Sequence, residues 1–346
     1  MLRLFLSSIV ARSIVAFLLS LILVMIFQPV FINWFRKRKL GQPIRHDGPQ
    51  THTVKQGTPT MGGLVVVASV ILSTLLLTDL MNPYVWIMIG ITSGYGLLGF
   101  MDDYSKVRDK SSKGVSARSK LYCQFGLALV LVSILVFFVP NYSTEVSIPF
   151  MSSVKMELSY FYILFGALIV VGASNAVNLT DGLDGLVIVP VMSVAFAYGI
   201  FAYVAGHAKI AEYLQITGIQ GAGDLSIFAA ALIAGGLGFL WYNSFPAQIF
   251  MGDVGALAIG GALGMLAVIT KNELVLVIAG GVFVVEALSV ILQVASYKMT
   301  GKRIFKMAPI HHHFELKGMA EPKIIVRAWI ISVVLAIVSI ATLMPL

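Results

Sequence analysis

The chain has 346 residues, of which 58% are hydrophobic and only 12% are charged, and its mean hydropathy is +0.91. Soluble domains carry about a quarter charged residues, so this composition excludes an ordinary soluble protein and indicates an integral membrane protein. The net charge of +8 does not indicate a nucleic-acid partner, because the distribution of Lys and Arg between loops matters more in a membrane protein than their total.

Ten apolar segments are long enough to cross a bilayer, since each is close to the ~20 residues that span ~30 Å of hydrocarbon. The predicted spans are 12–34, 61–79, 84–101, 121–139, 158–176, 186–205, 226–243, 253–270, 274–297 and 324–343. The sequence therefore predicts an all-α integral membrane protein with ten transmembrane helices, organised as a single transmembrane domain over residues 1–346. A small hairpin is expected near residues 140–157, where Val146, Ile148 and Phe150 alternate with other residues.

The basic residues divide unequally between the two sides of this arrangement. Assigning the loops to alternate sides places 19 Lys and Arg residues on one side and five on the other. By the positive-inside rule the first side is cytoplasmic, so both termini face outward. The same alternation places the aspartate clusters described next on the cytoplasmic face.

Asp102 and Asp103 directly follow the third predicted span. Two adjacent carboxylates repel each other, so one holds its proton more tightly unless a cation neutralises both. The alternative is a solubilising helix end, but the C-terminus of a helix disfavours negative charge. The pair is therefore a candidate for a functional site.

Asn175, Asn178, Asp181 and Asp184 recur every three residues at the end of the fifth span. At helical spacing they would line one face, whereas in a glycine-containing loop they would converge on a ligand. Their oxygen atoms suit Mg²⁺ or hydrogen bonds to a polar head group, and do not suit zinc. An ordinary turn rich in Asn and Asp is the alternative.

Asp253 stands at the predicted N-terminus of the eighth span, where the helix dipole favours a carboxylate or a phosphate. A plain N-cap explains it equally well.

His311, His312 and His313 are consecutive and cannot all face one way, so a zinc site made from them alone is not expected. Their imidazoles can instead donate to phosphate oxygens or shift protons near neutral pH. For Glu286, in the middle of the ninth span, a buried structural hydrogen bond and a catalytic role are equally compatible with the pattern.

The chain resembles the polyprenyl-phosphate N-acetylhexosamine-1-phosphate transferases over essentially its whole length. The resemblance is carried, in this order on the ten spans, by Asp102-Asp-Tyr104, Asn178-Leu-Thr-Asp-Gly-Leu-Asp-Gly185, Met251-Gly-Asp253 and His311-His-His-Phe-Glu315. The strings Thr58-Pro-Thr-Met-Gly-Gly63 and Pro309-Ile-His-His-His-Phe-Glu315 are similar to those of members that use UDP-MurNAc-pentapeptide, which favours these over relatives that use UDP-GlcNAc.

This resemblance implies an activity, a cofactor and partners. The activity would be the transfer of phospho-MurNAc-pentapeptide from UDP-MurNAc-pentapeptide to undecaprenyl phosphate, giving lipid I and UMP in the first membrane step of peptidoglycan synthesis, with Mg²⁺. The location would be the bacterial cytoplasmic (inner) membrane, with the active site facing the cytoplasm. A homodimer embedded in the lipid bilayer is expected, with no nucleic-acid partner.

The resemblance also implies roles for individual residues. Asp253 would hold Mg²⁺ against the diphosphate, and Asp102 would be the base that deprotonates the lipid phosphate, with Asp103 beside it. The histidines His311, His312 and His313 would approach the phosphates or the sugar. The remaining substrate-binding residues would be Lys55, Asn175, Asn178, Asp181, Gly182, Leu183, Asp184, Asn243 and Phe250.

Direct attack by the lipid phosphate is favoured over a phospho-aspartate intermediate, because this phosphate is already a competent nucleophile. Two other functions remain as alternatives. One is a related polyprenyl-phosphate GlcNAc-1-phosphate transferase. The other is an ion-coupled transporter or lipid flippase, since carboxylates within the membrane also couple ions. A transporter is expected to place its carboxylates near the bilayer midplane, where only Glu286 is predicted here.

Overall fold

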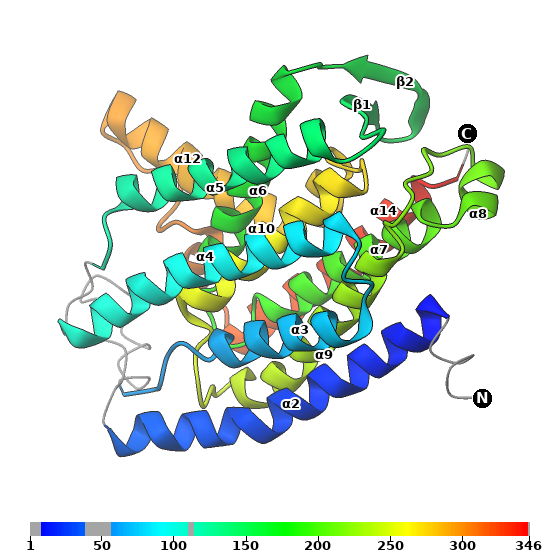
Figure 1. Ribbon diagram of the computed structural model, residues 1–346. Helices are drawn as coiled ribbons and strands as arrows, with labels where there is room; N and C mark the ends of the chain where they lie inside the picture. The colour runs from blue at the N-terminus through cyan, green and yellow to red at the C-terminus, as the bar shows by residue number, and fades with distance from the viewer. Residues whose placement is uncertain (1–7, 39–56, 110–113, 345–346) are drawn as a thin grey trace.

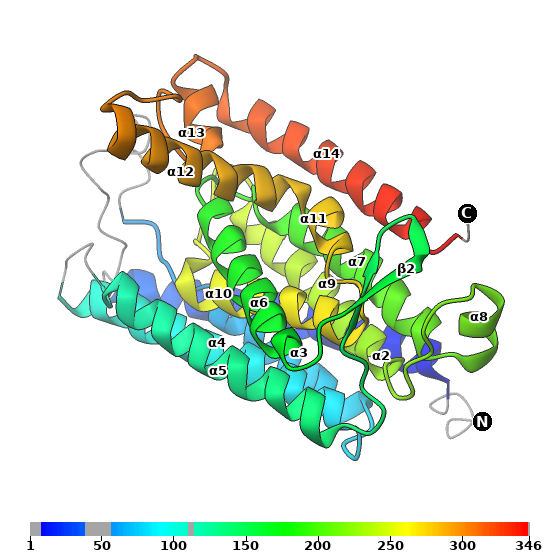
Figure 2. The same ribbon diagram turned by 90° about the horizontal axis from the view of Figure 1, so that it is seen from above.

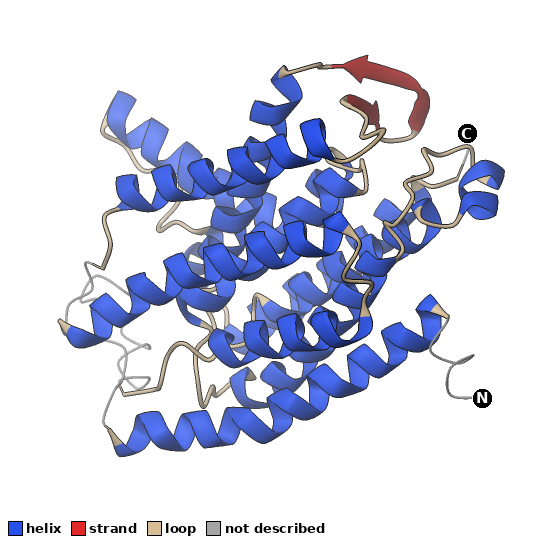
Figure 3. Ribbon diagram, viewed as in Figure 1, coloured by secondary structure: helices blue, strands red, loops and turns tan. Residues whose placement is uncertain are grey.

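The computed structural model describes residues 8–38, 57–109 and 114–344 as a bundle of helices with one small hairpin (Figures 1 and 3). The first half contains α2 (Ile9–Lys37), α3 (Gly63–Leu77), α4 (Pro83–Arg108), α5 (Ala117–Phe138), β1 (Glu145–Ile148), β2 (Met151–Glu157) and α6 (Phe161–Thr180). The second half contains α7 (Ile188–Ala205), α8 (Ala208–Tyr213), α9 (Asp224–Asn243), α10 (Gly252–Ile269), α11 (Val275–Ala279), α12 (Gly281–Thr300), α13 (Ile310–Glu315) and α14 (Glu321–Ala341).

The predicted all-α membrane architecture is confirmed. Within the described residues, nine helices are long and apolar enough to cross a membrane, and α3 is an apolar helix of 15 residues. Each lies within or close to one predicted span, although the ninth span is divided at Gly280 into α11 and α12. That all ten segments cross the bilayer stays a prediction.

The helix of the third predicted span does not end with that span at residue 101, because α4 continues to Arg108. A helix of 26 residues is about 39 Å long and extends beyond ~30 Å of hydrocarbon. Lys106 stands one turn after Asp102 and its Nζ lies 2.5 Å from the Asp102 Oδ2, a pairing that supports the additional turns. Asp102 and Asp103 therefore lie inside a helix and not at its C-terminus.

The hairpin and both ends of the described chain lie at the end of the bundle opposite to Asp102 (Figures 1 and 2). Strands β1 and β2 pair antiparallel, with Glu145 opposite Glu157 and Val146 opposite Met156, which confirms the expected hairpin. The start of α2 and the end of α14 lie at the same end of the bundle (Figures 1 and 2). The side of the membrane that they face stays a prediction.

Helix α10 occupies the centre of the bundle (Figures 1 and 2), and all of its residues from Val254 to Ile269 are buried. Glycines allow its neighbours to come unusually close. A Cβ on Gly99 of α4 would lie 2.3 Å from the carbonyl oxygen of Asp253, and one on Gly264 would lie 2.7 Å from the Cα of Val170 on α6. Small residues serve the same purpose in other membrane helix contacts. This packing places the last turns of α4 beside the first turn of α10.

Candidate active site

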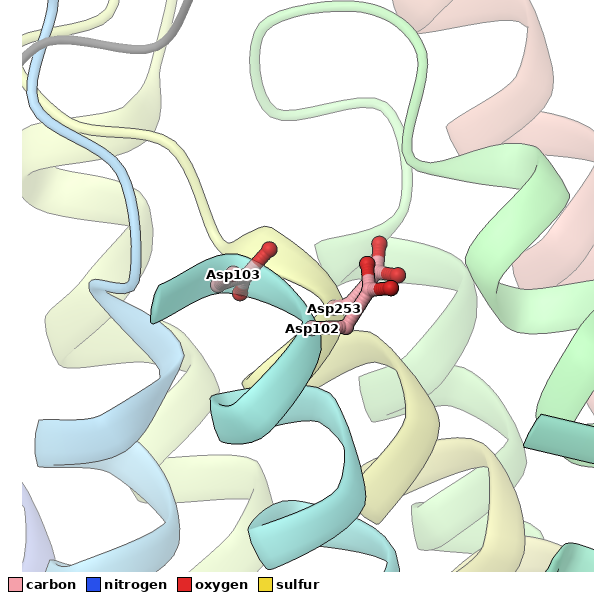
Figure 4. Close-up of side chains that lie close together, drawn as sticks. All are labelled: Asp102, Asp103 and Asp253. Atoms are coloured by element: carbon pink, nitrogen blue, oxygen red, sulfur yellow. The ribbon is translucent and has the colours of Figure 1, made fainter. Parts of the chain in front are cut away.

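Asp102, Asp103 and Asp253 meet where α4 passes the start of α10 (Figure 4). One carboxylate oxygen of each lies within 4.8 Å of the others, and Asp102 and Asp103 are buried. Because Asp103 and its partner Val254 on α10 are 151 residues apart in sequence, no local motif could have shown the contact. The structure brings together three residues that the sequence marks as candidates.

The two neighbouring aspartates of α4 point in different directions (Figure 4). Asp102 lies beside Asp253, and its Oδ1 accepts a hydrogen bond from the backbone N of Val115 at 2.7 Å. Asp103 is turned toward the start of α10, where its Oδ2 accepts from the backbone N of Val254 at 3.0 Å. Since α10 has no side-chain cap of its own, Asp103 caps this helix from α4.

Two lysine side chains form ion pairs with the carboxylates. Lys106 Nζ is 3.3 Å from Asp253 Oδ2 in addition to its contact with Asp102. Lys120 of α5 is 2.8 Å from Asp253 Oδ2 and 3.4 Å from Asp102 Oδ2. These side chains are at most 21% exposed, so solvent screens the attraction much less than at a surface.

From the sequence, Lys106 and Lys120 are predicted only as cytoplasmic charges. The spacing of four residues between Asp102 and Lys106 could have revealed the first. No pattern in the sequence links Lys120 to Asp253, which lies 133 residues away.

The donor set suits a Mg²⁺ ion. Carboxylate oxygens are the hard ligands that Mg²⁺ prefers, and the three aspartates carry one more charge than Lys106 and Lys120 neutralise. Asp102 and Asp253, whose carboxylates lie side by side, are the pair best placed to share such an ion.

The segment after α6 is held in place by its own side chains and by α14. Asp184 Oδ2 accepts from the backbone N of Ala247 at 2.9 Å, and the backbone N of Asp184 donates to Glu321 Oε1 at 3.1 Å. Trp329 Nε1 donates to the carbonyl oxygen of Gly185 at 3.1 Å. Asp184 therefore has a structural role in addition to the predicted contact with substrate.

Asn243 joins this segment to the connection before α10. Its Oδ1 accepts from the backbone N of Gly185 at 3.0 Å, and its Nδ2 donates to the carbonyl oxygen of Ile249 at 2.8 Å. The side chain is buried, so both contacts are protected from water. Asn243 thus joins the segment after α6 to the connection that leads into α10.

Asp181 follows α6, and the charges of the acidic cluster affect the pKa of its carboxyl. Burial, together with the charges of Asp253, Asp103 and Asp184, raises the pKa of the Asp181 carboxyl to about 8. In the metal-free protein this group is therefore largely protonated at neutral pH, and it can donate a hydrogen bond.

The string Thr58–Gly63 lies against the connection that leads into α10. The backbone N of Phe250 donates to the carbonyl oxygen of Pro59 at 2.9 Å, and the backbone N of Gly62 donates to that of Phe250 at 2.9 Å. These contacts hold Phe250 at the entrance of the helix that carries Asp253. Lys55 lies outside the described residues.

Asn175 and Asn178 occupy the last turns of α6. Asn175 Nδ2 donates to Gln124 Oε1 on α5 at 3.0 Å and to the carbonyl oxygen of Val171 at 2.8 Å. Asn175 is thus engaged between α5 and α6, whereas Asn178 lies one turn nearer to Asp181.

The three histidines of α13 point to different partners, as their adjacency predicts. His312 Nδ1 lies 2.6 Å from Glu315 Oε2, and His313 Nδ1 accepts from the backbone N of Lys306 at 3.0 Å. Partial burial and the charges of Lys317 and Lys306 hold the pKa of His313 below its ordinary value, which suits an accepting nitrogen. His311 faces Gly182, since a Cβ on that glycine would lie 2.2 Å from its Nε2.

The fold and the site define a multi-pass membrane protein with a buried acidic centre, compensated by lysines, at one end of its bundle. Glycosyl transferase family 4 matches residues 85–271 of the chain. The phospho-N-acetylmuramoyl-pentapeptide-transferases of Citrifermentans bemidjiense and Geobacter sp. strain M21 are each 56% identical over 332 residues, which cover 96% of this chain and 92% of the relative. That of Pelobacter propionicus is 54% identical over the same shares. The chain belongs to glycosyl transferase family 4.

Proposed function

We propose that the chain transfers phospho-MurNAc-pentapeptide from UDP-MurNAc-pentapeptide to undecaprenyl phosphate, producing lipid I and UMP in the first membrane step of peptidoglycan synthesis. The observation that carries this proposal is the convergence of Asp102, Asp103 and Asp253 in a chain 53–56% identical, over 96% of its length, to transferases of this name. A site made of carboxylates and lysines suits phosphoryl transfer, which needs charge neutralisation and alignment more than covalent help.

In the transfer step an oxygen of the lipid phosphate bonds to the phosphorus that carries the sugar. The bond from this phosphorus to the bridging oxygen breaks, and UMP leaves with the electron pair. Asp102 is the proposed base for a proton on the lipid phosphate, because its carboxylate is buried beside Asp253. Lys106 and Lys120 would offset the charge of the diphosphate, and both already bind carboxylate oxygens there.

Mg²⁺ is the proposed cofactor, and when bound it would withdraw charge from the diphosphate oxygens. Asp253 would hold it, with Asp102 beside it. Asp103 would keep the first turn of α10, and hence Asp253, in position through its bond to Val254. Lys106 and Lys120 would then exchange some of their carboxylate contacts for contacts with phosphate.

The substrate would extend from the acidic cluster along the segment after α6. Asp253 lies close enough to Asp181 to influence its titration, which supports one continuous site. The residues proposed to bind the nucleotide sugar are Lys55, Asn175, Asn178, Asp181, Gly182, Leu183, Asp184, Asn243, Phe250, His311, His312 and His313.

We further propose that the end of the bundle with the acidic cluster faces the cytoplasm of a bacterial inner membrane. The excess of Lys and Arg on the loops of that side supports this orientation. The ten helices would form one transmembrane domain over residues 1–346 with both termini outward. The protein would act as a homodimer.

Product analysis with purified full-length protein separates this function from its alternatives. We expect UMP and lipid I from UDP-MurNAc-pentapeptide, and no transfer from UDP-GlcNAc. Transfer from UDP-GlcNAc would instead support the related transferase, and substrate flux across liposomes without cleavage would support a transporter. Labelled phospho-enzyme trapped in the absence of lipid would contradict direct attack.

A further inference from the structure

Glu286 lies in the second turn of α12 and is 5% exposed. Its Oε2 is 3.0 Å from Nδ1 of His311 and 3.5 Å from the backbone N of the same residue. An ionised carboxylate can only accept hydrogen bonds, so both nitrogens donate to it. The contact places the ring proton of His311 on Nδ1 and leaves Nε2 on the opposite side of the ring.

Nε2 of His311 faces the segment after α6. The His311 side chain is 1% exposed, and within the described part of the chain Nε2 has no hydrogen-bond partner. A Cβ on Gly182 would lie 2.2 Å from Nε2 and 2.7 Å from Cε1, so the ring is packed directly against this glycine. Gly182 immediately follows Asp181, whose carboxyl interacts with Asp253 and Asp103.

A buried nitrogen without a partner is costly in a folded protein, so it indicates that a ligand completes the site. Nearby polar groups have partners already. The backbone N of Gly185 is bound by Asn243, and the carbonyl oxygen of Gly185 is bound by Trp329. His311 is therefore held on one side by a carboxylate, and its buried Nε2, which lacks a partner among the described residues, faces the predicted substrate segment.

We propose that Glu286 is a positioning residue for the transfer reaction. It fixes the His311 ring through Nδ1 and thereby directs Nε2 at the segment that begins with Asp181 and Gly182, where Nε2 forms a hydrogen bond with the nucleotide-sugar substrate when it binds. This inference rests on the proposed function. A carboxylate that orients a functional imidazole has the same role in metal sites and in hydrolase triads.

The test compares Glu286→Gln with the wild type in full-length protein purified in detergent. We expect kcat/KM for UDP-MurNAc-pentapeptide to fall by about 10- to 100-fold, the usual loss when such an orienting partner is removed. Ser289→Ala is the matched control, because Ser289 is buried one turn away and its Oγ donates to the carbonyl oxygen of Glu286 at 2.7 Å, not to the carboxylate. This variant is expected to keep wild-type activity.

A double-mutant cycle distinguishes positioning from general stability. If Glu286 acts through His311, then adding Glu286→Gln to His311→Ala lowers activity no further than His311→Ala alone. When turnover is too slow to follow, the same cycle can be measured by calorimetry on the Kd of UDP-MurNAc-pentapeptide. It then gives the coupling between Glu286 and His311 in substrate binding. Losses that multiply in the double variant would overturn the proposal, as would a Glu286→Gln variant with the activity of Ser289→Ala.

Gly182→Ala reaches the same ring without changing a membrane helix, and it decides the question if Glu286→Gln does not fold. Its methyl group would displace the His311 ring, so we expect a loss of activity that disappears in the His311→Ala background. An equal loss in both backgrounds would contradict the proposal. If wild-type protein itself releases no UMP, the proposed function fails, which is a different result from either of these.

Discussion

Replacing Gly99 with alanine tests whether the packing of α4 on α10 sets the geometry of the acidic cluster. The new methyl group would lie 2.3 Å from the carbonyl oxygen and 2.4 Å from the carbonyl carbon of Asp253, whereas ordinary contact begins at 3.4 Å. The obstacle is helix backbone, which cannot rotate away, so the two helices must separate by about 1 Å. Asp102 and Asp103 lie one turn further along α4 and would move away from Asp253 with it.

A displacement of 1 Å in a catalytic group can cost about 100-fold in rate, so we expect UMP release by Gly99→Ala to fall by about this factor. Gly126→Ala on α5 is the matched control, because, apart from the backbone of its own helix and its chain neighbours, no atom of the described residues lies within 4 Å of its new methyl group. Both variants should elute as folded protein on size-exclusion chromatography. A Gly99→Ala enzyme as active as Gly126→Ala would show that the packing at Gly99 does not set the geometry of the acidic cluster.

Three further substitutions test single contacts. Asp253→Asn is expected to abolish UMP release and leave the protein folded, because an amide cannot replace a charged ligand; near-normal activity would remove Asp253 from the metal site. Asp181→Asn is expected to raise the melting temperature of the metal-free protein at pH 9, with a difference that shrinks toward pH 4. The folded-state pKa of about 8 lies above the ordinary 3.8, so wild-type stability falls by about 1.4 kcal/mol per pH unit between these values; equal melting temperatures at pH 9 would contradict this. Asn243→Ala leaves the backbone N of Gly185 and the carbonyl oxygen of Ile249 without their partners. It should reduce the free energy of unfolding by about 1–3 kcal/mol. An unchanged denaturation midpoint would show that these hydrogen bonds contribute nothing to stability.

The sequence predicted the features that depend on local pattern. Apolar length located the helices, and alternation located the hairpin that β1 and β2 form. Loop alternation also placed Asp102, Asp103 and Asp253 at one end of the bundle, because which end of a helix a residue occupies depends only on chain order.

Contacts between helices could not be predicted in this way, because apolar length does not determine which helices are neighbours. The approach of α4 to α10 depends on the absence of a side chain at Gly99, and the pairing of Lys120 with Asp253 depends on where α5 lies beside both. The partner of Glu286 could not be predicted for the same reason, since His311 lies on α13, a separate helix that packs against α12.

The most direct test of the account is UMP release from UDP-MurNAc-pentapeptide by the purified full-length protein, measured with and without Mg²⁺ and with and without undecaprenyl phosphate. We expect UMP only when both are present, in amounts equal to the lipid I formed. UMP formed without the lipid acceptor, or at the same rate after Mg²⁺ is chelated, would contradict it.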